Sequence, residues 1–314
     1  MVVAAITAVH FTDPACPWAY SARPAHARLR WRFGEQIEWR LVLIGLSESV
    51  EAYEARGYTP DRLLDTQRRF SKRFGMPYSF ERKPRMAGTA RACRAIIAAR
   101  ELDPALGEQA LRALQLLQFT TPGLLDDDED LRAALGTVPG LEADLVVGRI
   151  DDPDVVAAYR ADRALARSAE GSPTHAQDRF STSDGPIRYT APSVIFEDRS
   201  GRRLEVGGFQ PFEAYDTALA NLNVELERRP APDDILEALL EVPDGLTTAE
   251  LASVMRPSDL VDADFEATAA KLAELTEIGA VSREPAGVDA IWRAAAGGAD
   301  AGTATAASGA TQRA

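Results

Sequence analysis

The stretch Phe11-Thr12-Asp13-Pro14-Ala15-Cys16-Pro17-Trp18-Ala19-Tyr20 decides how this chain is interpreted, because it joins a predicted strand to a predicted helix. Residues 2–11 are rich in Val, Ile and Thr, which favour a buried strand, and Thr12-Asp13-Pro14 is a turn signal. Pro17 suits the first turn of a helix, which we expect to continue over residues 18–33. Cys16 is therefore expected at the N-terminus of the first helix.

That position gives Cys16 a chemical meaning. Unpaired backbone N–H groups and the positive end of the helix dipole stabilise a thiolate, so we expect a pKa below the usual value of about 8.5. A small buried apolar cysteine is the competing interpretation. The strand-to-helix turn favours the reactive thiol.

The rest of the chain extends this strand and helix into a larger α/β pattern. Residues 37–44 alternate like a second strand, and residues 47–167 carry helical periods without a strand signal. The polar stretch 170–189 is predicted to be a loop. Two short strands then form a hairpin over 193–206, and a helix is expected over 210–228. The order is therefore βαβ, a helical block, and ββα.

A second unit follows the proline-containing linker at 228–232. Three short helical patterns and a hairpin over 233–294 have the outline of a winged helix, with a capping box predicted from Thr247 and Glu250. Acidic residues outnumber basic ones in this unit, which disfavours nucleic-acid binding and favours protein interaction, including a homodimer through the unit. Residues 296–314 are small and polar, so we expect them to be disordered.

Composition excludes several functional classes. The chain has 314 residues, 35 Lys plus Arg, 48 Asp plus Glu, a net charge of −13, two cysteines and three histidines. These numbers fit a globular protein and argue against a disulfide framework, structural zinc or a bound metal. No apolar run is long enough to span a membrane, and we expect a cytoplasmic protein with reduced thiols.

Several segments together resemble the DsbA-like thioredoxin-fold family, especially its FrnE-type members and the 2-hydroxychromene-2-carboxylate isomerases. The resemblance lies in four segments: the stretch around Cys16, Ala191-Pro192 before a strand, residues 207–212, and residues 88–94 at the start of a helix. The resemblance implies a thioredoxin fold made from residues 1–46 and 186–228, with an inserted helical domain over 47–185.

The resemblance also implies roles for individual residues. Cys16 would be the nucleophile, Pro17 and Trp18 would shape its groove, and Pro192 would be a cis proline beside it. Ala191 would offer its backbone to a bound peptide or a small thiol such as glutathione. A trans proline opening an edge strand is the alternative for Pro192.

The family's second cysteine, three residues after the first, is replaced here by Ala19. Cys16 therefore cannot form a local disulfide, and a mixed disulfide on it would need an external thiol or a distant cysteine for release. Cys93 is the internal candidate for this resolving role, with a buried helix cysteine as the alternative. His10 and His26 are expected to be packing or surface residues, and His175 lies in the polar loop before Pro192.

Three functions remain open. The leading hypothesis is a cytoplasmic thiol-disulfide oxidoreductase that acts on a protein disulfide or a small-molecule thiol through Cys16 alone. The second is a transferase or isomerase that depends on glutathione or another low-molecular-weight thiol and holds no tightly bound cofactor. The third is a non-catalytic thioredoxin-fold adaptor.

Overall fold

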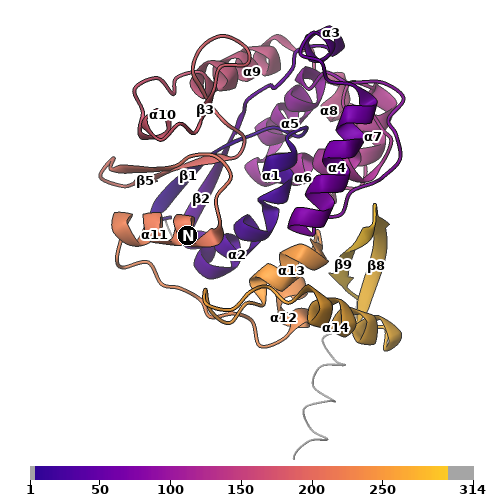
Figure 1. Cartoon of the computed structure of the whole chain (residues 1–314), viewed down its shortest axis with the longest axis vertical. Helices are drawn as coiled ribbons and strands as arrows, with labels where there is room; N and C mark the ends of the chain where they lie inside the picture. The colour runs from indigo at the N-terminus through magenta and orange to yellow at the C-terminus, as the bar shows by residue number, and fades with distance from the viewer. Residues whose placement is uncertain (1–3, 296–314) are drawn as a thin grey trace, which may run out of the picture.

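A four-stranded sheet forms the centre of the computed structural model, which describes residues 4–295 (Figure 1). The strands lie in the order β2, β1, β5, β6, and their bounds are β1 Ile6–Thr12, β2 Ile37–Leu43, β5 Ser193–Asp198 and β6 Arg203–Val206. β1 pairs in parallel with β2 and antiparallel with β5. The pairing places Phe11, at the end of β1, opposite both Val42 and Ser193, so the turn after β1 lies beside the start of β5.

Two helices follow β1 where the sequence predicted one. α1 spans Pro17–Ser21 and α2 spans Arg23–Phe33, and the short η1 (Gly34–Gln36) leads into β2. The break at Ala22 has a local cause: Pro24 has no N–H to donate to the carbonyl group of Tyr20, so the helix cannot run through regularly. Helix α11 (Phe212–Leu222) returns to the sheet after β6, and its residues Phe212, Tyr215, Leu219 and Leu222 are buried against it.

A helical segment lies between β2 and β5. Its main helices are α3 Val50–Glu54, α4 Pro60–Phe74, α5 Ala90–Leu102, α6 Pro104–Thr120, α7 Asp128–Leu135, α8 Ala143–Gly148 and α9 Pro153–Ala166. α5 is the centre of this segment because its alanines, isoleucines and Cys93 are buried against α6 and α9. α3 and α8, of five and six residues, are too short to give a helical period in the sequence. None of the helices within residues 4–295 is long and apolar enough to cross a membrane.

The stretch predicted as a loop over 170–189 contains regular structure. It holds the short helix α10 (Pro173–Ala176) and a two-stranded pair, β3 (Phe180–Ser181) with β4 (Arg188–Tyr189). Strands of two residues are too short to produce an alternating pattern, so periodicity could not reveal them.

The C-terminal segment packs directly on the rest of the molecule. Its elements are α12 Ile235–Leu240, β7 Leu246–Thr247, α13 Thr248–Val254, α14 Phe265–Glu277, β8 Val281–Ala286 and β9 Asp289–Ala294, with a sheet in the order β7, β9, β8. The capping box of Thr247 and Glu250 is confirmed. α13 lies against α2, and Trp31 of α2 belongs to the apolar core of this segment (Figure 1). The predicted disordered tail over 296–314 lies outside the described residues.

Candidate functional site

Cys16 is the N-cap residue of α1, directly after the turn that ends β1. Its side chain is 6% exposed, and its Sγ donates a hydrogen bond to the backbone carbonyl oxygen of Ala191 at 3.1 Å. The pairing of β1 with β5 produces this contact, because it brings the residues before Ser193 next to the turn after Phe11. The structure therefore brings Cys16 and Ala191 together.

The expectation of a lowered pKa at Cys16 is wrong for the protein in this conformation. Burial raises the pKa of the Cys16 thiol to about 12, and the carboxylate of Asp13 also raises it. The N–H groups of Ala19 and Trp18 lower the pKa, as expected at a helix N-terminus, but less than burial raises it. α1 has only five residues, so its dipole is short, and desolvation of the charged form prevails.

A groove of about 790 Å³ opens beside Cys16, and we call it the Cys16 groove. Pro17, Trp18 and Ala191 contribute to its walls, whereas Pro192 is buried and is not among the residues that line it. The Ala191–Pro192 peptide bond is cis. A volume of this size is typical of sites for small molecules and short peptide segments.

Trp18 connects α1 to α4 at the edge of this groove. Its ring is 38% exposed and contacts Phe70 and Phe74 of α4 at centroid distances of 4.7 and 5.8 Å. On the other side it contacts Phe209 at 5.5 Å, in the segment between β6 and α11. The side chain therefore links α4 to the 207–211 segment at the edge of the groove, where Phe74 and Phe209 also contact each other at 4.8 Å.

The Cys16 groove is also strongly basic, which the sequence analysis did not detect. Six of its lining residues are cationic: Arg56, Arg62, Arg69, Arg73, Lys83 and Arg188. None of the described residues that line the groove has a carboxylate. The overall charge of −13 hid this feature, because the bases come from four separate segments that only the fold brings together.

Cys93 lies in α5 and is not joined to Cys16. Both cysteines are free, and the Cys93 thiol is fully buried in the apolar core of the helical segment. Its Sγ lies 3.7 Å from Oδ2 of Asp13, which also accepts the N–H of Leu46 at 2.8 Å. Burial raises the pKa of Cys93 well above its usual value, and Asp13 raises it further.

The three histidines lie away from the Cys16 groove. The rings of His10 and His26 are 4.8 Å apart and buried, and burial lowers the pKa of His26 to about 3 and that of His10 well below its usual value. The Nδ1 of His175 accepts the N–H of Gly171 in the loop near α10. Of the two positions expected for His10 and His26, packing or surface, the structure places both rings in the packed interior.

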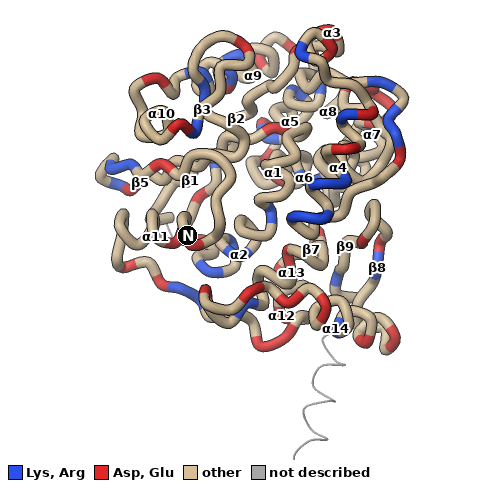
Figure 2. The backbone as a smooth tube through the Cα atoms, viewed as in Figure 1, with Lys and Arg blue, Asp and Glu red and all other residues tan. Residues whose placement is uncertain are grey.

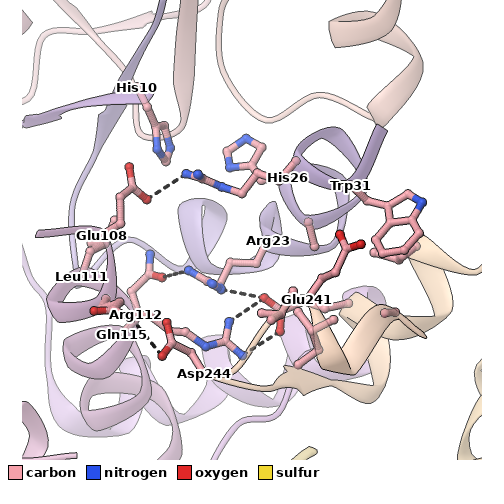
Figure 3. A pocket seen from close by; sticks show the side chains of 18 of the residues that line it. His10, Arg23, His26, Trp31, Glu108, Leu111, Arg112, Gln115, Glu241 and Asp244 are labelled. Atoms are coloured by element: carbon pink, nitrogen blue, oxygen red, sulfur yellow. Dashed lines mark hydrogen bonds and ion pairs between the residues drawn. The ribbon is translucent and has the colours of Figure 1, made fainter. Parts of the chain in front are cut away.

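A second cavity, of about 310 Å³, lies where α2 and α6 meet the C-terminal segment (Figure 3). His10 and His26 lie at one end (Figure 3), and Glu250, which also lines the cavity, forms a buried ion pair at 2.7 Å to Arg112 and 2.8 Å to Arg23. These contacts join the first helices, the helical segment and α13. The cavity has mixed charge, unlike the Cys16 groove.

Comparison with known proteins gives one family match. The family model of the DSBA-like thioredoxin domain matches residues 7–179. A curated relative, the ClpXP adapter protein SpxH of Shouchella clausii (strain KSM-K16), is 25% identical over 246 residues, which are 78% of this chain and 76% of the relative.

Solved structures also match this chain, at low sequence identity. A candidate protein disulfide isomerase from Nitrosomonas europaea aligns with a TM-score of 0.51 and 16% identity, over 69% of this chain and 96% of the other. The cytosolic disulfide reductase DsbM from Pseudomonas aeruginosa aligns with a TM-score of 0.48 and 20% identity, over 69% of this chain and 99% of the other. These structures cover about two thirds of this chain.

Proposed function

This chain belongs to the family of DSBA-like thioredoxin domains, and from that premise we propose that it exchanges disulfides through the single thiol of Cys16. The observation that carries the proposal is the position of this thiol, which belongs to the N-cap residue of α1, lies beside an open groove and faces the Ala191 carbonyl group. Cys93 is buried elsewhere, and Ala19 occupies the place of a local partner. The exchange therefore uses one protein thiol and an external one.

The reaction has two balanced steps. The Cys16 sulfur attacks one sulfur of a substrate disulfide and loses its proton to solvent; the substrate S–S bond breaks, and its other sulfur leaves as a thiolate. A new S–S bond then joins Cys16 to the substrate. A low-molecular-weight thiol of the glutathione class attacks the substrate sulfur in this mixed disulfide, and the Cys16 thiol is regenerated while the substrate keeps the small thiol.

Substrate binding supplies a way to release the Cys16 thiol for attack. The Ala191 carbonyl oxygen accepts the Cys16 hydrogen bond, and Ala191 lies two residues before the start of β5 and lines the groove. An extended substrate segment that donates an N–H group to this oxygen competes with the thiol for its acceptor. The hydrogen bond that favours the protonated thiol is then weakened at the moment when a substrate is present.

The remaining elements of the proposal concern organisation and location. We propose that residues 47–185 form an inserted helical domain and that 233–294 form a winged-helix-like unit used in protein interaction. The helix–strand–helix–helix–hairpin order of the C-terminal segment supports the second assignment. Free Cys16 and Cys93 thiols support a reducing, cytoplasmic location.

Trapping the mixed disulfide tests the proposal. The full chain and its Cys16→Ser and Cys93→Ser variants are incubated with oxidised glutathione or a peptide disulfide and analysed by intact mass spectrometry. We expect a single adduct in the wild type and in Cys93→Ser, none in Cys16→Ser, and its release by reduced glutathione. An adduct that persists in Cys16→Ser, or no adduct in any protein, overturns the proposal.

An adaptor is the second candidate, because the SpxH match extends over 78% of the chain and the resting Cys16 thiol is held protonated. In that case the groove and the C-terminal unit bind other proteins, and Cys16 does not react. Titration with purified ClpXP separates the candidates. An adaptor binds equally well as wild type and as Cys16→Ser, and neither protein forms an adduct with oxidised glutathione.

A further inference from the structure

Positive charge is concentrated in the Cys16 groove, although the chain as a whole is acidic. Four of its arginines lie on or just before α4: Arg56, Arg62, Arg69 and Arg73. Among the described residues, none of these four guanidinium groups has a carboxylate within ion-pair distance. Figure 2 shows the basic positions along α4.

The contacts of these arginines leave their charge uncompensated. Arg56 donates to the carbonyl oxygens of Ala52 and Leu46, and Arg62 donates to that of Gly57. Arg69 contacts a carbonyl and a hydroxyl oxygen of its own helix. Neutral acceptors hold the side chains in place but do not cancel their charge, so an anionic ligand is still favoured.

Arg73 is held by aromatic rings instead. Its guanidinium carbon lies 5.9 Å from the ring centroid of Trp18 and 5.0 Å from that of Phe74. This contact places a cation at the wall formed by Trp18, close to Cys16. Positive charge and the nucleophilic thiol thus share one groove.

The second cavity provides an internal contrast. Each of its three arginines has a carboxylate partner: Arg23 and Arg112 share Glu250, and Arg30 pairs with Glu108 at 2.8 Å. The arginines of the second cavity are therefore neutralised by carboxylates, unlike the four arginines on or just before α4. The two carboxylates of α4, Asp61 and Asp65, do not line the Cys16 groove.

The spacing of the arginines on α4 indicates the shape of the ligand. Arg62, Arg69 and Arg73 lie on one face, at distances along the helix of about 10 Å and about 6 Å. Alternate side chains of an extended peptide are about 6.7 Å apart. Cations spread over this length fit several separate carboxylates better than one compact anion.

We propose that the Cys16 groove binds an acidic, extended polypeptide segment that brings a cysteine or disulfide to Cys16. The segment lies between α4 and Ala191, and its carboxylates pair with the α4 arginines. This inference rests on the proposed function for the role of Cys16, and it adds the substrate class. The whole chain carries a net charge of −13, so the surface outside the groove repels acidic proteins. The basic groove attracts them.

The test measures binding and chemistry separately. The probe is a fluorescent peptide with a central cysteine and glutamates at alternate positions, and the reference peptide has glutamines instead. Anisotropy titrations use the full-length Cys16→Ser protein, so that no covalent bond contributes. We expect the acidic peptide to bind at least roughly tenfold more tightly than the reference, and the difference to shrink as the salt concentration rises.

A matched pair of double variants locates the binding site. Arg69→Glu with Arg73→Glu removes two groove cations, whereas Arg68→Glu with Lys72→Glu makes the same change in charge at exposed positions of α4 outside the groove. We expect the first pair to abolish the preference for the acidic peptide and the second to retain most of it. Equal losses in both pairs, or no preference in the parent protein, overturn the inference.

Three further outcomes separate this inference from the proposed function and from a smaller ligand. If wild-type protein forms mixed disulfides equally fast with both peptides and Cys16→Ser shows no preference, disulfide exchange stands and the inference fails. If Cys16→Ser prefers the acidic peptide but wild type forms no adduct, the inference about binding stands without the chemistry. If coenzyme A displaces the acidic peptide and binds more tightly, a small polyanionic thiol is the ligand and the peptide assignment is wrong.

Discussion

The Sγ atom of Cys16 donates a hydrogen bond to the carbonyl oxygen of Ala191, which is 3.1 Å away in space and 175 residues later in the chain. The contact exists because β5 pairs with β1, so the segment before Ser193 reaches the turn that follows Phe11. A carbonyl oxygen can accept a hydrogen bond but cannot donate one, so it stabilises the thiol over the thiolate. Cys16 is therefore positioned at the groove for reaction, but its thiol remains protonated.

The first prediction concerns the pH dependence of Cys16 alkylation. Because burial raises the pKa to about 12, the thiolate fraction should increase about tenfold for each pH unit between pH 7 and pH 11. The rate of alkylation follows the thiolate fraction. It is measured by treating the Cys93→Ser variant with iodoacetamide for fixed times and quantifying the product by mass spectrometry. A rate that levels off near pH 8 would show that the free protein already holds a reactive thiolate.

The second prediction adds the missing thiol. Ala19→Cys places a second sulfur three residues after Cys16, across the first turn of α1, where the Cα atoms are about 5 to 6 Å apart and suit a disulfide. We expect this variant to form a 16–19 disulfide on oxidation and to gain activity in an insulin reduction assay. Ala19→Ser is the control of matched size, and it should gain neither. Failure of Ala19→Cys to oxidise would show that Ala19 is not positioned as the second thiol of a dithiol pair.

The third prediction concerns the buried histidines. His26 has a pKa near 3 in the folded protein and about 6.5 when unfolded, so the unfolded state binds more protons in acid. The stability that depends on its neutral form is complete above pH 6.5 and is lost as the pH falls toward 3. Both nitrogens of His10 lack a hydrogen-bond partner among the described residues, and its lowered pKa acts in the same direction.

Urea unfolding of the wild type and of His26→Gln measures this effect. The variant should lose less stability on acidification, by about 1.4 kcal/mol per pH unit between roughly pH 5.5 and pH 4. If the two proteins lose stability in parallel over this range, His26 is not the group that titrates.

The sequence was sufficient for the elements that depend on local patterns. The strand before Cys16, the proline at the start of α1 and the capping box at Thr247 each follow from neighbouring residues. The break at Ala22 was also encoded locally, by Pro24, but helix formers on both sides obscured it.

Properties that depend on tertiary burial could not be predicted in the same way. The helix N-terminus predicted a low pKa for Cys16, but the loss of solvent on packing against Ala191 reverses the direction. The basic groove was hidden for a similar reason, since the fold brings Arg188 and the cysteine turn at residues 13–18 against the arginines on and just before α4. Net charge describes the whole chain, whereas recognition depends on which charges the fold collects in one place.

The last prediction concerns Glu250, whose buried carboxylate holds the C-terminal segment on the body. It accepts from both terminal nitrogens of Arg112, from Nε of Arg23 and from the N–H of Thr247, and these partners lower its pKa although burial raises it. Glu250→Gln removes the charge, leaves two arginines without compensation and turns an amide N–H toward another donor. We expect a loss of roughly 3 to 5 kcal/mol in the free energy of unfolding and faster trypsin cleavage near residues 228–234.

The control is Glu241→Gln, because Glu241 is a half-exposed carboxylate of the same cavity and pairs with Arg229. This substitution should lower the free energy of unfolding by less than about 1 kcal/mol. If both variants unfold and are cleaved like the wild type, the ion pair does not anchor the segment and the apolar contacts of Trp31 suffice.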